Sequence, residues 1–252
     1  MFNDITTHLV LRFRKLLYWD DRRLNLEKIK EYAKAIEGVV GADKVWGFID
    51  GTMQPFCRPG ENQRMYYSGH KKQHGFQYQS IMTPDGLMSS LHGPYTGPTG
   101  DWAMWNDSGL NSKLKSIMAL PEMEGGERRG GVAESRYYLY GDLAYWPVFG
   151  IMGPYRQQDP VVPLSRVEVS ANLLMSSACI AVEWGFAMNI NYWGFNGYRK
   201  GAKLGSSPVA AYYMISTLLT NFHTCLKGRN QVSDKFIIQP PSLEEYVHSI
   251  LL

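Results

Sequence analysis

Three acidic residues stand out because each interrupts or ends an otherwise apolar segment. Asp50 ends VWGFID, Asp142 ends RYYLYGD, and Glu183 lies inside the apolar stretch 166–189. If these side chains converge, they cannot all stay ionised and unpaired, because like charges a few ångströms apart repel strongly. A divalent cation with oxygen ligands, Mg²⁺ or Mn²⁺, removes that repulsion. Pairs of such ions are the usual apparatus for cleaving a phosphodiester bond.

The elements that carry these acids are expected to meet at one edge of a sheet. The segments 45–50 and 136–142 are short and rich in aromatic and β-branched residues, which predicts two buried strands that end on Asp50 and Asp142. If the strands are neighbours, both aspartates lie at the edge where open α/β sheets place their sites. A helix over about 166–189 that crosses this edge would add Glu183. The order of these elements predicts an α/β, ribonuclease-H-like mixed sheet flanked by helices.

The remaining pattern supplies further helices and a hairpin. Apolar spacing predicts helices over 5–17, 25–37, about 110–119, about 207–224 and the C-terminal residues after Ser242. Asn25 is expected to cap the second helix, and Ser242 with Glu245 forms a capping-box pattern. Two strands within 75–93 are expected to join at Thr83-Pro84-Asp85-Gly86. Residues 121–135 and 150–164 are expected to be loops.

Length and composition are those of an ordinary globular chain. The 252 residues carry a formal charge of +3, and 44% are hydrophobic against 19% charged. We expect an N-terminal helical segment over 1–40 and one domain over 41–252. Cys57, Cys179 and Cys225 form neither a disulfide framework nor a CxxC metal motif, which favours a reducing intracellular compartment. We expect neither a signal peptide nor a membrane-spanning run, and hence no membrane partner.

A cluster of cationic residues follows Asp50. Its members are Arg64, His70, Lys71, Lys72 and His74, with Tyr66 and Tyr67 beside them. One interpretation is a DNA-binding surface, because lysine and arginine neutralise phosphates and tyrosine stacks on bases. The other is an ordinary solvated loop, which is what a run of charges usually is.

A set of ordered motifs links the chain to a known family. GFIDGT, CRP, QRMYYSGHKKQH, FQYQSIMTPDGL, GPYTGPTGDW, YGDLAY, MSSACIAVEWGF and PPSLEEY occur in this order. Together they resemble the DDE-superfamily endonuclease domain of PIF/Harbinger-type transposases and of the nucleases derived from them, from about residue 30 to the end. The resemblance implies that Asp50, Asp142 and Glu183 are catalytic, metal-binding acids. Asp101 matches a further aspartate of the family and is an auxiliary or rival metal ligand.

The same resemblance implies an activity, a cofactor and partners. It implies metal-dependent cleavage or strand transfer of DNA with Mg²⁺ or Mn²⁺, in the nucleus or also in the cytoplasm. Related transposases carry a helix-turn-helix domain ahead of the catalytic core, so segment 1–40 is expected to be a remnant or a truncated part of one. A separate Myb/SANT-like DNA-binding protein is then an expected partner.

Two departures from the family pattern leave an alternative open. Cys179 stands where the family usually has an arginine, four positions before the glutamate, and Gly100 replaces a histidine before Asp101. The alternative is a catalytically inactive, transposon-derived module that binds DNA or protein. A glycosidase that uses two carboxylates is a third hypothesis, and dependence on a metal would exclude it.

Overall fold

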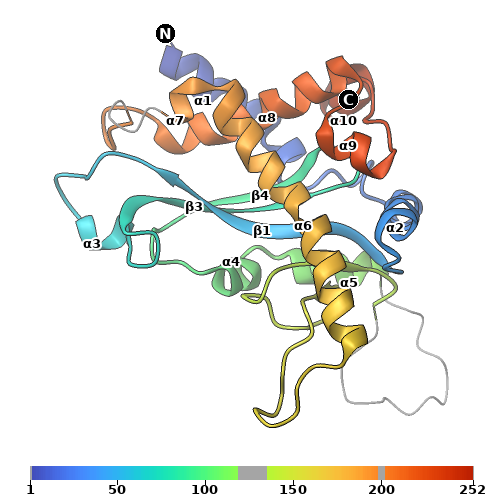
Figure 1. Cartoon of the computed structure of the whole chain (residues 1–252). Coiled ribbons are helices and arrows are strands. Elements are labelled where there is room, and N and C mark those ends of the chain that lie inside the picture. The colour runs from blue at the N-terminus through green and yellow to red at the C-terminus, as the bar shows by residue number, and fades with distance from the viewer. Residues whose placement is uncertain (1, 119–134, 198–201, 252) are drawn as a thin grey trace.

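A mixed sheet forms the centre of the protein (Figure 1). The computed structural model describes residues 2–118, 135–197 and 202–251. Within these ranges six strands pair in one sheet: β1 (Val45–Pro55), β2 (Tyr67–Ser68), β3 (Gln73–Met82), β4 (Met88–Tyr95), β5 (Tyr138–Tyr140) and β6 (Ile151–Met152). β3 pairs antiparallel with β1, β2 and β4, whereas β1, β5 and β6 run parallel. The predicted α/β, ribonuclease-H-like fold is confirmed.

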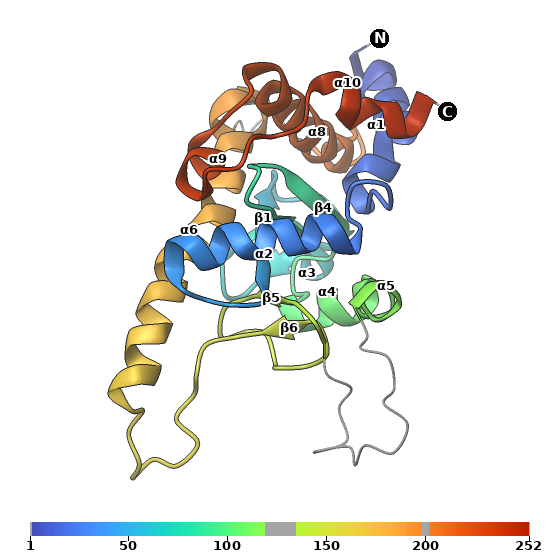
Figure 2. The ribbon, with the colours of Figure 1, turned by 90° about the vertical axis from the view of Figure 1, so that its right-hand side faces the viewer.

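Helices flank this sheet (Figures 1 and 2). Those of the described ranges are α1 (Phe2–Tyr18), α2 (Leu26–Val40), α3 (Gln63–Tyr66), α4 (Asp101–Asp107), α5 (Leu110–Met118), α6 (Arg166–Tyr192), α7 (Gly194–Gly197), α8 (Val209–Lys227), α9 (Gln231–Phe236) and α10 (Leu243–Leu251). The expected N-terminal helices are present, with α2 packed on β1 and α1 packed on α8, α10 and β4. The division of the chain at residue 40 stays a prediction.

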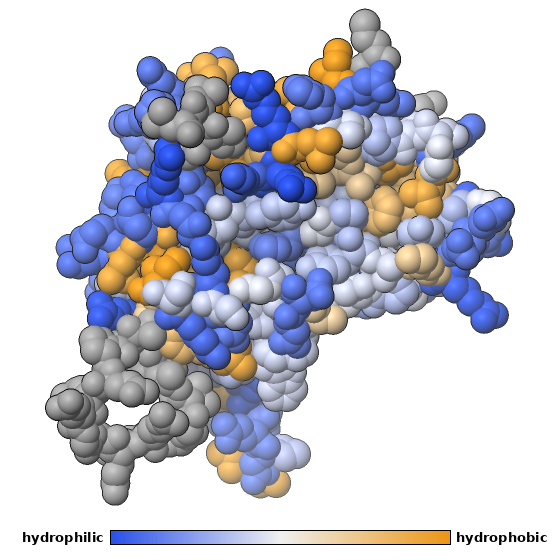
Figure 3. Space-filling view, turned by 180° about the vertical axis from the view of Figure 1, so that it is seen from behind, coloured by the Kyte–Doolittle hydropathy of each residue, from blue (hydrophilic) through white to orange (hydrophobic). Residues whose placement is uncertain are grey.

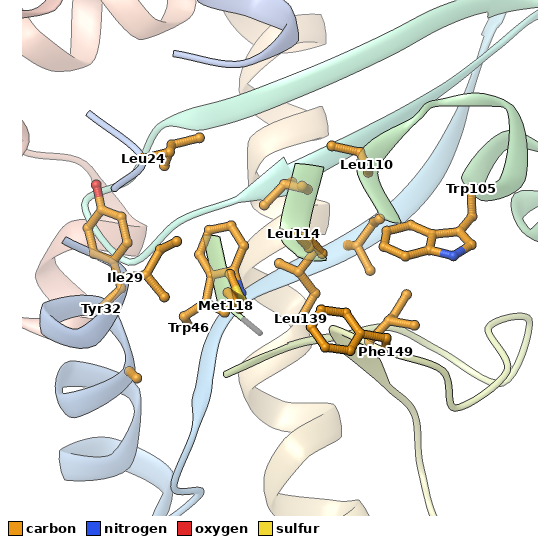
Figure 4. Close-up of a cluster of buried hydrophobic side chains, with 14 of the residues drawn as sticks. Leu24, Ile29, Tyr32, Trp46, Trp105, Leu110, Leu114, Met118, Leu139 and Phe149 are labelled. Carbon is orange, nitrogen blue, oxygen red and sulfur yellow. The ribbon is translucent and has the colours of Figure 1, made fainter. Parts of the chain in front are cut away.

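Separate apolar clusters join the sheet to its helices. One lies between β1, β5, α2 and the α4–α5 pair; Figure 4 labels its members Leu24, Ile29, Tyr32, Trp46, Trp105, Leu110, Leu114, Met118, Leu139 and Phe149. Another packs Phe48 and Met82 against Val182 of α6 and Phe236 of α9. A third joins α1, α8 and α10 to the β3–β4 hairpin. The face seen in Figure 3 is largely polar, with its apolar side chains in separate patches.

Helix α6 is long and apolar enough to cross a membrane when judged by length and composition alone. The most apolar 18-residue window of this helix is 39% buried inside the protein, where α6 packs on β1, β3, α8 and α9. The core helix of a globular protein passes the same test, so this finding is weak support for a membrane span. The expectation that the protein has no membrane partner stays a prediction.

Most of the predicted elements are present, and their ends have the predicted chemistry. The side chain of Asn25 accepts a hydrogen bond from the amide of Lys28 at the start of α2. Ser242 and Glu245 form both bonds of the capping box at the start of α10. β3 and β4 are joined through the predicted turn at residues 83–86. Local side-chain chemistry therefore identified these ends correctly.

Three predictions about strands and loops need correction. The strand predicted over 136–142 is shorter, because β5 covers only Tyr138–Tyr140 and Asp142 lies in the turn after it. Asp50 does not end β1, because this strand continues to Pro55 and Asp50 is paired with Ser80 of β3. The apolar run stops at Ile49, but the polar residues after it still have an antiparallel partner in β3. The segment 150–164 is not entirely loop, since β6 lies within it. Residues 119–134 lie outside the described ranges, so the loop expected over 121–135 is described only at Ser135.

Candidate metal centre

Three aspartates meet at the edge of the sheet where the parallel pairing ends. Asp50 lies on β1 beyond Phe48, the last residue paired with β5, and Asp142 follows β5 by two residues. Asp101 is the first residue of α4. One carboxylate oxygen from each of these three residues lies within 4.8 Å of the other two. The predicted convergence of Asp50 and Asp142 is therefore observed, and Asp101 joins them.

Gly51 leaves space for the Asp101 side chain, and Gln79 holds the Asp101 backbone by a hydrogen bond. These two residues are paired across β1 and β3. A Cβ atom on Gly51 would lie 1.7 Å from a carboxylate oxygen of Asp101, so only glycine lets this aspartate approach the strand. The side-chain nitrogen of Gln79 donates to the backbone carbonyl of Asp101 at 3.1 Å. Glycine is therefore required in the motif DGT because any larger residue would collide with Asp101, which lies 50 positions later in the chain.

The protonation of the cluster reflects its concentration of negative charge. Burial raises the pKa of Asp50 to about 7, and the charges on Asp101, Asp142 and Glu183 add to this shift. The backbone amide of Gly51 donates to Asp50 at 2.7 Å and opposes the shift. Burial, followed by the charge on Asp142, also raises the pKa of Asp101, whereas Lys71 and His70 lower it. Near neutral pH the cluster therefore holds carboxylates that have too little positive charge beside them.

These residues fit a hard divalent cation. The group within 4.8 Å contains three carboxylates and neither histidine nor cysteine. Oxygen donors of this kind suit Mg²⁺ or Mn²⁺, while zinc sites more often use nitrogen and sulfur. A bound cation would also supply positive charge next to Asp50, whose raised pKa shows that its ionised form is poorly stabilised in the metal-free protein. Asp50, Asp101 and Asp142 are the residues that would hold it.

Glu183 lies outside this group of ligand atoms. It is exposed on α6, yet its charge reaches both Asp50 and Cys179. Cys179 is half-buried one turn earlier on the same helix. Burial raises the pKa of its thiol to about 12, with further contributions from Asp50, Asp142 and Glu183. The thiol therefore faces the acids as a neutral group.

The cationic residues predicted after Asp50 fall into two places. His70 and Lys71 lie in the exposed turn between β2 and β3, where their charges reach Asp101. Lys72 belongs to the same turn and has a left-handed backbone with φ of 51°. Arg64 and His74 instead line a small open pocket together with Arg58, Gln63 and Tyr67. The rings of Tyr67 and His74 lie 5.2 Å apart, centre to centre.

A larger cavity is separate from the acids. It has a volume of about 1040 Å³ and lies between the end of α2, the loop after β6 and the first half of α6. Its lining includes Tyr140, Trp146 and Met175 but none of the three clustered aspartates. Its position gives no support for a role in the chemistry of the metal centre.

Sequence reasoning missed Gly51, Gln79 and Tyr145 as parts of this site. Gln79 is fully buried and also donates to the hydroxyl of Tyr145 at 3.0 Å. A signal was present, since Gln77 and Gln79 occupy alternate positions of a strand that is otherwise largely apolar. Polar side chains on one face of a buried strand require hydrogen-bond partners, and here the partners belong to the site.

The geometry agrees with a comparison against known proteins. A family model described as DDE superfamily endonuclease matches residues 49–221, a range that contains Asp50, Asp101, Asp142 and Glu183. No curated protein and no solved structure matches the chain. Nucleases of this family use divalent metals and act on DNA. The match covers more than half of the 252 residues, and the chain therefore belongs to the DDE superfamily of endonucleases.

Proposed function

We propose that this protein is a Mg²⁺- or Mn²⁺-dependent DNA endonuclease of the PIF/Harbinger type, with transposase-like cleavage or strand transfer as its reaction. The observation that carries the proposal is the approach of three aspartates within 4.8 Å in a chain of this family. The motifs from GFIDGT to PPSLEEY support the narrower assignment to the PIF/Harbinger type.

The bound metal would supply activation of a water molecule or a DNA 3′-hydroxyl and stabilisation of the charge on the scissile phosphate. The chain itself supplies the carboxylates of Asp50, Asp101 and Asp142 and holds them at fixed separations. Glu183 on α6 adds negative charge that acts on Asp50. Lys71 and His70 add positive charge beside Asp101, where a DNA phosphate would need compensation.

The proposal gives Asp101 a larger part than the motif resemblance alone implied. Asp101 shares the compact group with Asp50 and Asp142, whereas Glu183 is exposed and lies outside it. We assign Asp50, Asp101 and Asp142 to the first cation. Glu183, whose charge contributes to the raised pKa of Asp50, is assigned to the completed site with DNA present.

A plasmid-nicking assay tests these assignments. We expect Asp50→Asn, Asp101→Asn and Asp142→Asn each to lower Mg²⁺-dependent nicking by about 1,000-fold or more, because each removes a charge from a cation site. Asp107→Asn is the matched control, since Asp107 is exposed on the same helix as Asp101 and is not part of the acid group. Nicking that survives Asp50→Asn, or that does not need the metal, would refute the proposed function.

The comparison of Asp101→Asn with Glu183→Gln decides between the two rival acids. If Asp101→Asn leaves nicking intact while Glu183→Gln abolishes it, the assignment of Asp101 is wrong. The metal-binding acids are then Asp50, Asp142 and Glu183, as the motif resemblance implies. Loss of nicking in both variants supports a site that uses all four acids.

A second candidate function is a catalytically silent module that binds DNA or protein. Cys179 favours it, because its neutral thiol faces Asp50 and Asp142 where the related motif carries an arginine. Cys179→Arg discriminates between the two hypotheses. A chain without nicking activity that gains it on Cys179→Arg carries a lesion, whereas nicking by the natural chain excludes the silent module.

The cellular setting is also a proposal and rests on the motif resemblance alone. We place the protein in the nucleus, with the cytoplasm as a second location, and a separate Myb/SANT-like protein as the partner that selects the target sequence. Imaging of a tagged full chain tests the location. Pull-down with a Myb/SANT-like protein from the same genome tests the partner, and failure of both leaves the nicking proposal intact.

A further inference from the structure

Gln79 connects two segments that carry metal-site acids. Its side chain is fully buried on β3, directly across from Gly51 on β1. The side-chain nitrogen donates to the backbone carbonyl of Asp101 at 3.1 Å and to the hydroxyl of Tyr145 at 3.0 Å. One primary amide therefore uses both of its hydrogens on two segments that are more than 40 residues apart in the sequence.

Each of these bonds acts close to an acid. Asp101 is itself the first residue of α4, so the bond to its carbonyl fixes the start of that helix over Gly51. Tyr145 belongs to the turn after β5, where its backbone amide donates to the carbonyl of Asp142 at 3.2 Å. Holding Tyr145 therefore holds the turn that contains Asp142. The ring of Tyr145 is fully buried, so it transmits this restraint with little freedom to move.

The hydrogen-bond pattern of Gln79 is costly if its role is only to stabilise the fold. Among the described residues, its side-chain oxygen is buried and has no hydrogen-bond partner. An unpaired buried acceptor costs about 1–3 kcal/mol, which offsets much of what the two donated hydrogen bonds contribute to folding. Retention of a buried amide at this position is explained by what its two donors hold.

We propose that Gln79 is a positioning residue of the metal centre: through Asp101 and Tyr145 it sets the separation between the Asp101 and Asp142 carboxylates. This inference rests on the proposed function, because it gives Gln79 a purpose at the same cation site. Gln79 does not itself need to touch the cation or the DNA. Its effect is to pre-form a site that would otherwise have to order two independent loops when the cation binds.

Gln77 provides a matched comparison on the same strand. It lies two residues earlier, so it projects from the same face of β3, and it is also buried. Its side-chain nitrogen donates to the backbone carbonyl of Gly97 at 3.0 Å. Gln77 therefore holds the loop before Asp101, but no hydrogen bond of its side chain reaches the turn that carries Asp142 within the described ranges. A purely structural role predicts similar consequences for the two residues.

The test compares Gln79→Met with Gln77→Met in the full chain. The probe is Mn²⁺ alone, titrated by calorimetry without DNA. We expect Gln79→Met to weaken Mn²⁺ binding by about 10-fold, the size of effect seen when residues that orient metal ligands are removed. Gln77→Met should change it by less than about 2-fold. Tyr145→Phe removes only a hydroxyl and should weaken Mn²⁺ by a smaller factor, in the same direction.

A second readout uses the metal-free protein in chelator. Amide hydrogen exchange should accelerate in both 100–104 and 142–146 for Gln79→Met, but only around 96–101 for Gln77→Met. If Gln79→Met does not fold, the milder Tyr145→Phe provides the decision, since it must still weaken Mn²⁺ binding and loosen 142–146.

The possible outcomes distinguish the positioning role of Gln79 from the proposed metal-dependent function on which it rests. If the natural chain binds Mn²⁺ in a way that Asp50→Asn abolishes, yet Gln79→Met and Gln77→Met weaken it equally, the positioning role is overturned and the metal site stands. If neither Gln79→Met nor Tyr145→Phe changes Mn²⁺ affinity, the positioning role is also overturned. If Asp50→Asn binds Mn²⁺ as well as the natural chain does, both proposals fail together.

Discussion

Two clusters of acidic side chains in this protein differ in whether a cation of the protein itself compensates their negative charge. At the turn between β3 and β4, Asp85 is fully buried and is paired with Arg23 at 3.2 Å. Its carboxylate also accepts hydrogen bonds from Tyr32 at 2.5 Å and Thr83 at 2.6 Å. At the sheet edge, Asp50, Asp101 and Asp142 share one small volume, and no arginine or lysine forms an ion pair with them among the described residues.

The difference concerns where the compensating charge comes from. Burial alone would lower the pKa of Arg23, but its electrostatic interactions with Tyr32 and Asp85 raise that pKa above the ordinary value, so this cation is permanent. Among the described residues, Lys71 and His70 bring positive charge to Asp101, and neither forms an ion pair with it. A buried acid with an internal cation is part of the architecture, whereas acids left without one form a site for a cation from solution.

The largest expected effect on stability comes from removing the internal cation. Arg23→Met should lower the free energy of unfolding by about 3–5 kcal/mol, because it leaves the fully buried Asp85 without its charge partner. Urea denaturation in chelator measures this. Lys113→Met is the control, since Lys113 pairs with the exposed Asp21 and should change stability by less than about 1 kcal/mol. Equal effects of the two variants would mean that the Arg23–Asp85 pair does not stabilise the fold more than an exposed ion pair does.

The acid cluster should respond with the opposite sign. The pKa of Asp50 is raised from 3.8 to about 7 in the folded chain, so the folded state holds this proton more tightly than the unfolded state does. This contribution to stability is present below pH 3.8 and is lost as pH rises through about 7. In chelator at high pH, Asp50→Asn should therefore stabilise the protein by about 2 kcal/mol, after allowance for partial solvent screening.

Thermal unfolding at two pH values and with Mg²⁺ measures this difference. The advantage of Asp50→Asn should shrink toward acid pH, where the natural chain is also neutral at this position. Mg²⁺ should stabilise the natural chain and leave Asp50→Asn almost unchanged. A metal-free Asp50→Asn protein that is less stable than the natural chain would show that Asp50 is a structural acid like Asp85.

The closeness of the acids can be disturbed without changing any charge. Gly51→Ala would place a Cβ atom 1.7 Å from a carboxylate oxygen of Asp101, so the aspartate must rotate away while the strand stays paired. We expect Mn²⁺ affinity to fall by about 10-fold, or about 1.4 kcal/mol, with a smaller change in unfolding. Gly100→Ala is the control, because a Cβ atom there meets nothing within 4 Å. Equal Mn²⁺ affinity in the two variants would show that Asp101 is not a ligand.

The sequence predicted the parts of this comparison that depend on short-range chemistry. The expectation that the strands carrying Asp50 and Asp142 are parallel neighbours is met, and the two acids lie close together with Asp101, a residue that only the motif resemblance singled out. The capping residues Asn25 and Ser242 were also correct, because a cap involves only the next three residues.

Contacts between distant segments could not be predicted in the same way. The sequence predicts Asp85 only as a turn residue, because its arginine lies 62 positions away in the link between α1 and α2. The sequence predicts too early an end for β1, because a polar strand is recognised only from its partner, here β3. The alternation of Gln77 and Gln79 indicates that these side chains need hydrogen-bond partners, but it does not show that the partners of Gln79 are Asp101 and Tyr145. Each missed feature depends on tertiary proximity that residue spacing does not encode.

The smallest expected effect separates a cation that opposes a metal from one that attracts DNA. The charge of Lys71 lowers the pKa of Asp101, and the same charge repels a divalent ion held by that carboxylate. Lys71→Ala should therefore tighten binding of Mn²⁺ alone by about 2-fold, since the charge is exposed and well screened. Binding of DNA should weaken, and the slope of log affinity against log salt should fall by about 1, because one phosphate contact is lost.

Lys30→Ala is the matched control for Lys71→Ala, because Lys30 is exposed on α2 and belongs to the same residue type. It should leave both Mn²⁺ and DNA binding unchanged. If Lys71→Ala weakens Mn²⁺ and DNA together, Lys71 supports the fold of the site as Arg23 supports Asp85. Tighter Mn²⁺ binding together with weaker DNA binding would instead mean that Lys71 binds the substrate. The metal would then compensate the negative charge of the acid cluster, and a DNA phosphate would compensate the positive charge of the turn between β2 and β3.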